Sequence, residues 1–95
     1  MNTDDLLQER GKTHGDWAHQ SAVAASIKLV LREALGYSNR ELPPPPLSEA
    51  LDIIAVKLAR IVCGDALEPD HWRDIAGYAR LAEVWVMAQE GKVAA

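Results

Sequence analysis

One carboxylate, Asp74, falls on the side of a predicted helix that is otherwise apolar. The helix spans about residues 70–89, and its polar side chains cluster together on a wheel of 100° per residue. Asp74 lies among the apolar residues instead, near Leu81 and Trp85. Because a buried carboxylate without a partner is strongly destabilising, we expect a cation, a metal ion or several hydrogen-bond donors beside Asp74.

Asp70 and His71, about one turn earlier, complete the candidate group on this helix. Asp70 and Asp74 have i,i+4 spacing, which makes their side chains neighbours, and His71 is a potential metal ligand or general acid. Each residue also has a simpler interpretation. Asp70 is well placed to cap the free N–H groups of the helix start, and a histidine in a first helical turn is often just exposed.

The preceding helix carries a second candidate group of two carboxylates and two cations. Glu49, Asp52 and Arg60 lie along one stripe, and Lys57 flanks it. Carboxylate oxygens suit Mg²⁺, and Lys and Arg suit phosphate, so the group fits a metal-and-phosphate site. The alternative is a solvated face whose charges complement the helix dipole. Lys28, in an earlier helix, can reach a bound anion or keep its ammonium group in water.

Four helices are expected to position these residues. The patterns of apolar residues, caps and breakers place them at residues 4–10, 17–35, 49–63 and 70–89. Thr3, Asp16 and Ser48 are the expected N-caps. A proline-rich connector at 37–47 should be extended, and the tail 90–95 should be frayed. We therefore predict one all-α domain, residues 1–95, folded as a compact bundle with a short first helix and three longer ones.

Composition narrows the classes of partner. The net charge is −4 with both signs mixed along the chain, and no basic stripe suited to nucleic acid is evident. No apolar run approaches the roughly 20 residues of a membrane span, and Cys63 has no second cysteine with which to form an internal disulfide. We expect a cytoplasmic protein without membrane contact. The short chain and its apolar helix edges favour a homo-oligomer.

Two segments together resemble a known family. The runs Glu49-Ala-Leu-Asp-Ile-Ile-Ala-Val-Lys-Leu-Ala-Arg60 and Asp70-His-Trp-Arg-Asp-Ile-Ala-Gly-Tyr78, with the opening Arg10…His-Gly-Asp-Trp17, are similar to small uncharacterised phage and prophage proteins. Those proteins look related to the MazG-like all-α nucleotide pyrophosphohydrolases. The resemblance covers roughly residues 5 to 83, and it implies a MazG-like helical bundle.

The resemblance also implies a chemistry. MazG-like enzymes hold Mg²⁺ with a Glu-Glu-x-x-Glu motif on one helix and a Glu-x-x-Asp motif on the next, and they release pyrophosphate from nucleoside triphosphates. The first motif corresponds here to Ser48-Glu49-x-x-Asp52 and the second to His71-x-x-Asp74, so Ser48 and His71 replace two glutamates.

The catalytic carboxylates that the resemblance implies are therefore Glu49, Asp52 and Asp74, which would also be Mg²⁺ ligands. Asp70 and His71 are further candidate ligands of this metal ion. The candidate phosphate contacts are Lys57, Arg60 and Lys28. The function implied is binding of a nucleotide or nucleotide-derived phosphate, with Mg²⁺-dependent hydrolysis at a degenerate site.

Helix arithmetic supports a different role for Asp74. If residues 64–69 form a hairpin, Asp74 lies level with Arg60 and near Lys57, whereas Asp52 is offset from it by about 10 Å at 1.5 Å per residue. The alternative function is thus a non-catalytic interaction protein. In that protein Asp74 and Arg60 form a structural ion pair, and the prolines 43–46 or an apolar groove contact a partner.

Overall fold

The computed structural model describes residues 2–94, with side chains for residues 2–90, and every regular element in that range is a helix. The elements are α1 (Thr3–His14), α2 (Trp17–Tyr37), α3 (Pro45–Cys63) and α4 (Pro69–Ala94). The predicted all-α bundle is confirmed.

Helix α1 is longer at both ends than its residue types suggested. Asn2, rather than Thr3, is the N-cap, because its side-chain oxygen accepts a hydrogen bond from the Asp5 N–H. The helix also passes through Gly11 and ends only before Gly15, whose φ of 82° is open to glycine but strained for other residues. A single glycine weakens a helix without stopping it.

Helix α2 begins as predicted and ends slightly later. Asp16 is its N-cap and accepts a hydrogen bond from the His19 N–H at 2.9 Å. Beyond Leu35 the helix continues through Gly36 to Tyr37. Here too the glycine is tolerated inside the helix.

Helix α3 begins inside the segment that we expected to be extended. Pro45 and Pro46 occupy its first turn, where a missing N–H is no loss because those N–H groups have no intrahelical partner. Ser48, the predicted N-cap, lies within the helix, and its hydroxyl donates to the Pro43 carbonyl at 2.7 Å. Gly64 follows the last residue of the helix, as predicted.

Helix α4 starts one residue before the predicted position and continues to Ala94, through part of the expected tail. Its exposed side carries two i,i+3 ion pairs, Arg73–Asp70 and Arg80–Glu83. Such pairs support a helix surface modestly.

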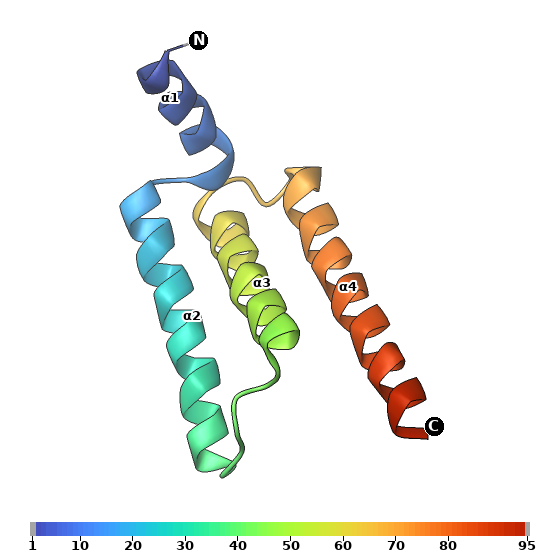
Figure 1. Cartoon of the computed structure of the whole chain (residues 1–95). Coiled ribbons are helices and arrows are strands. Elements are labelled where there is room, and N and C mark those ends of the chain that lie inside the picture. Colours follow the sequence, from blue (N-terminus) through green and yellow to red (C-terminus); the bar gives the residue numbers. More distant parts are fainter. Residues whose placement is uncertain (1, 95) are drawn as a thin grey trace.

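Helix α3 is the centre of a single layer of antiparallel helices (Figure 1). Helices α2 and α4 pack on its two sides, and within residues 2–94 they do not contact each other. The shorter α1 lies beyond the end of the layer where α3 finishes and α4 begins. The buried apolar residues are small and sit mainly where the helices meet: Ala24, Ala50, Ala55, Ala59 and Ile61. In the described part of the chain, no helix is long and apolar enough to cross a membrane.

Candidate functional site

Two glycine-containing turns cross at the end of the layer and create the site. Gly15 joins α1 to α2, and Gly64 begins the connection from α3 to α4. A Cβ atom on Gly15 would overlap the Cys63 carbonyl, and one on Gly64 would overlap the Thr13 carbonyl. The two backbones therefore touch, and only residues without a side chain allow this approach.

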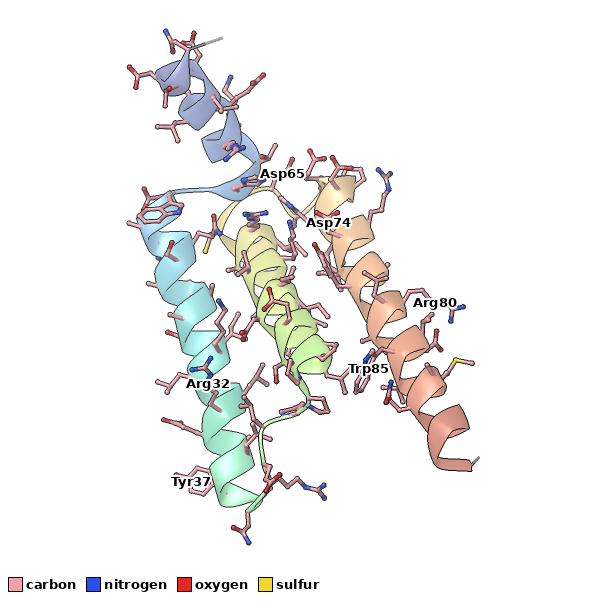
Figure 2. All side chains as sticks on the ribbon, in the orientation of Figure 1. Arg32, Tyr37, Asp65, Asp74, Arg80 and Trp85 are labelled. Atoms are coloured by element: carbon pink, nitrogen blue, oxygen red, sulfur yellow. The ribbon has the colours of Figure 1, made fainter. Side chains whose placement is uncertain are left out.

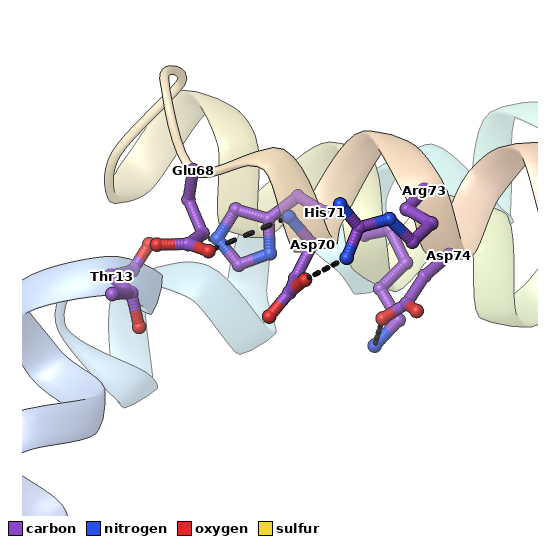
Figure 3. A network of polar contacts seen from close by, with 7 residues as sticks. Thr13, Glu68, Asp70, His71, Arg73 and Asp74 are labelled. Atoms are coloured by element: carbon purple, nitrogen blue, oxygen red, sulfur yellow. Dashed lines mark hydrogen bonds and ion pairs between the residues drawn. The ribbon is translucent and has the colours of Figure 1, made fainter.

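The Thr13 carbonyl, at the end of α1, ties the two turns together. It accepts a hydrogen bond from the Asp65 N–H at 2.9 Å. It accepts another from the His71 ring Nε2 at 2.9 Å, and Figure 3 shows these two residues. Because a carbonyl oxygen can only accept, His71 must carry a proton on Nε2. His71 is 2% exposed, so the interpretation of this residue as simply exposed is wrong. Its ring anchors α4 to α1.

His14 packs against His71 from the end of α1. The ring centroids are 5.1 Å apart and the rings are tilted by 49°. Partial burial is the main cause that lowers the pKa of His14, and the nearby basic groups, Arg60 first and then His71, Lys57 and Arg10, lower it further. Four basic side chains thus surround one imidazole that favours its neutral form.

Asp74 forms an ion pair with Lys57, not with Arg60, which the register of the helices had favoured. Its Oδ2 lies 3.0 Å from the Lys57 Nζ, and no Asp74–Arg60 ion pair occurs among the described residues. The hydrogen bond from Lys57 lowers the pKa of Asp74, and the charge of Lys57 adds to this effect. The Asp74 side chain is 45% exposed, so it is not buried as its apolar neighbours suggested. It projects toward α3 near the start of α4 (Figure 2).

Arg60 has no counter-ion in the part of the chain whose side chains are described. Its residue is only partly exposed, and its buried Nε has no hydrogen-bond partner among the described residues. A buried N–H without an acceptor costs about 1–3 kcal/mol. The site therefore holds one buried guanidinium N–H, the Arg60 Nε–H, without an acceptor among the described residues.

Arg60 lies between two adjoining clefts. The first, which we call the Arg10 cleft, has a volume of about 500 Å³ and is lined by Leu7, Arg10, Gly11, His14, Gly15, Asp16, Trp17, Gln20 and Arg60. The second, the Lys57 cleft, has a volume of about 420 Å³ and is lined by Thr13, His14, Lys57, Arg60, Glu68, Asp70, His71 and Asp74. His14 and Arg60 contribute to both.

The acids around the Lys57 cleft are largely paired already. Asp74 is bound to Lys57, and Asp70 is bound to Arg73 at 2.9 Å. Glu68 Oε1 lies 3.5 Å from the Asp70 N–H. Asp70 is exposed and pairs within its own helix, in keeping with its simpler interpretation at a helix start. Arg60 is thus the unpaired charge that both clefts share.

The structure brings three of the five predicted metal ligands, Asp70, His71 and Asp74, into the Lys57 cleft, but it does not add Glu49 or Asp52 to them. Asp52 lines a separate apolar pocket between α2 and α3, together with Leu31 and Leu51, whereas Asp74 lines the Lys57 cleft. Glu49 is exposed on α3, one turn before Asp52. Within the described residues, no group of three or more His, Cys, Asp or Glu side chains is arranged to hold a metal ion. Glu49, Asp52 and Asp74 of one chain therefore do not fit a shared Mg²⁺ ion.

The predicted phosphate contacts are only partly brought together. Lys57 and Arg60 lie side by side in the Lys57 cleft. Lys28 is on α2 and lines neither cleft. Arg10, His14 and Trp17 were not among our predicted site residues, although all three belong to the opening Arg10…His-Gly-Asp-Trp17 that carried part of the resemblance. That motif was the feature of the sequence from which these three site residues could have been predicted.

Comparison of the chain with models of protein families, with curated proteins and with solved structures finds no match. The MazG-like resemblance therefore stays a prediction.

Proposed function

We propose that this protein binds the phosphate group of a nucleotide or a nucleotide-derived anion, in the two clefts around Arg60. The observation that carries the proposal is the buried Nε of Arg60, which has no acceptor among the described residues. A phosphate supplies several acceptor oxygens and a counter-charge at once, and Arg is suited to bind it with paired hydrogen bonds.

The surroundings of Arg60 fit a phosphate better than a carboxylate-bound metal ion. Arg10 lines the Arg10 cleft, and His14, whose pKa is lowered, lines both this cleft and the one that holds the pair Lys57–Asp74. An anion bound here would also raise the pKa of His14, because a nearby negative charge favours the protonated imidazole. Arg10, His14 and Arg60 would then converge on one anion.

The Arg10 cleft also has a place for a base or another flat group. Trp17 is 77% exposed at its rim, and Leu7 adds apolar surface. Aromatic rings stack on nucleobases with little preference for sequence, and about 500 Å³ is within the usual range of ligand pockets. Trp17 beside two arginines therefore supports a nucleotide rather than free phosphate alone.

Binding can be tested by calorimetric titration with ATP and with inorganic pyrophosphate, using two variants matched in charge. Arg60→Gln removes the unpaired guanidinium, and we expect it to weaken binding by roughly 10- to 100-fold, the value of one hydrogen bond to a charged group. Arg80→Gln is the control, because Arg80 points away from α3 and pairs with Glu83 (Figure 2). Equal affinity of all three proteins, or no binding to either ligand, would refute the proposal.

Mg²⁺-dependent hydrolysis, with Glu49, Asp52 and Asp74 as catalytic carboxylates, stays a prediction from the resemblance. Since Asp52 and Asp74 line different pockets and Glu49 lines neither of them, the proposed binding function does not depend on these carboxylates. Release of pyrophosphate from a panel of nucleotides with Mg²⁺, abolished by Asp52→Ala, would support the hydrolase.

A second candidate, the non-catalytic interaction protein, is favoured by a different observation. Many large apolar side chains are exposed, among them Leu58, Val62 and Trp72. The ion pair first expected in this alternative is corrected, since Asp74 pairs with Lys57. The same exposed apolar surface is where the predicted homo-oligomer would form its contacts.

A further inference from the structure

The single chain buries almost no large side chain completely. Among residues 2–90, its buried apolar residues are four alanines and one isoleucine, Ile61, which is 7% exposed. Most of its leucines and valines are instead at least partly open to water. Each fully buried Val or Leu side chain contributes about 1.5–3 kcal/mol, whereas alanine contributes much less. A core of this kind is weak for a chain with so many apolar residues.

Six of the large exposed apolar side chains share one face of the helix layer, whereas others, among them Leu81, lie outside it. On the central helix α3, Leu51, Leu58 and Val62 share one side, because they recur at helical spacing. Lys57 and Arg60 lie on other sides of the same helix. The exposed apolar stripe therefore points away from the clefts.

The flanking helices extend this stripe. Both run antiparallel to α3 (Figure 1), and the wheel of each helix places exposed apolar residues on the side that Leu58 occupies. We call the combined surface the apolar face. Its exposed members are Val30, Leu51, Leu58, Val62, Trp72 and Val86. The opposite side of the layer carries the charged residues of the Lys57 cleft, including Lys57, Arg60 and Asp74.

The area of the molecule is too large for a compact monomer. A folded monomer of 10.4 kDa is expected to expose roughly 5,400 Å², whereas this chain exposes 7032 Å². The excess is about 1,600 Å², twice the roughly 800 Å² that each partner contributes to a standard stable interface. The radius of gyration, 16.2 Å, also exceeds the roughly 12 Å of a compact chain of this length.

We propose that the apolar face is covered by the same face of a second copy of this chain, so that two helix layers form one two-layer bundle. An apolar face is complementary to itself in chemistry, and a two-fold axis lets each residue of the patch meet the patch on the other copy. The charged side of each layer, with both clefts around Arg60, stays open in this arrangement. The proposal is therefore independent of the phosphate-binding function.

Sedimentation velocity of the full chain at micromolar concentration tests the proposal. We expect a mass of two chains, about twice 10.4 kDa, and a melting temperature that rises with protein concentration because folding and association are linked. Leu58→Glu places a charge at the centre of the apolar face and should raise the dissociation constant at least about 30-fold, as at an interface hot spot. If this variant needs the second copy to fold, it will be unfolded at the same concentration.

Leu81→Glu is the matched control. Leu81 is 65% exposed, like the members of the apolar face. It lies on the opposite side of α4 from Trp72, because the nine residues between them correspond to a rotation of about 180° around the helix axis. This variant should remain a folded dimer. A folded wild-type monomer with a concentration-independent melting temperature would overturn the proposal. Equal behaviour of the two variants would overturn it, and so would a wild-type chain that folds only when a different protein is added.

Discussion

Replacing Gly15 by alanine should remove a large share of the stability of the domain. Gly15 has φ 82° and ψ −171°, a region open almost only to glycine, and an alanine there costs about 1–3 kcal/mol in backbone strain. Its Cβ would also overlap the Cys63 carbonyl, so the two turns must separate. Separation breaks the hydrogen bonds of Thr13 with Asp65 and His71, each contributing about 0.5–1.5 kcal/mol.

The expected loss is therefore about 2–6 kcal/mol, a substantial part of the 5–15 kcal/mol typical of a small domain. Gly11→Ala is the matched control. A Cβ at Gly11 meets no atom within 4 Å, and this residue lies inside α1. Alanine should there stabilise the protein by about 0.5–1 kcal/mol, because it favours the helix.

Urea unfolding followed by circular dichroism measures both effects, at one fixed protein concentration so that association contributes equally. The ring proton on His71 Nε2 gives a second readout by NMR, since Gly15→Ala should expose it to exchange with water. The reasoning is refuted if Gly15→Ala destabilises the protein by less than about 1 kcal/mol, or if both alanine variants change stability in the same direction.

Two further predictions concern titration within the site. Because the pKa of His14 is lowered in the folded protein, the unfolded chain takes up this proton at a higher pH, and stability falls as the pH drops below about 6.5. His14→Gln should make urea midpoints at pH 7.5 and 5.5 more alike, and an unchanged difference would contradict the lowered pKa. Lys57→Met should raise the pKa of the Asp74 carboxyl toward its ordinary value, as followed by carbon NMR. Lys28→Met should leave that pKa unchanged, and a rise in both variants would count against the Lys57–Asp74 bond.

The helices were predictable where local chemistry decides their ends. Asp16 as the cap of α2 and Gly64 after α3 could be identified from residue type and position alone. Gly11 and the prolines at 45 and 46 misled the prediction, because glycine and first-turn proline are compatible with a helix when the rest of the chain favours it.

The site was predictable only within the α3–α4 hairpin. Register along that hairpin brought Asp74 close to both Lys57 and Arg60, but the choice of Lys57 depends on the rotation of each helix about its axis. The role of His14 depends on the crossing of two turns far apart in the sequence, at Gly15 and Gly64. Periodicity within single helices carries no information on such a crossing.

The central claim, that Arg60 binds phosphate, is tested most directly by NMR of the arginine Nε–Hε groups during titration with ATP and, separately, pyrophosphate. The Arg60 resonance should shift progressively and saturate, because its unpaired guanidinium gains an acceptor. The Arg80 resonance, already paired with Glu83, should stay in place. An Arg60 resonance that does not move with either ligand, or that moves only in parallel with that of Arg80, would contradict the claim.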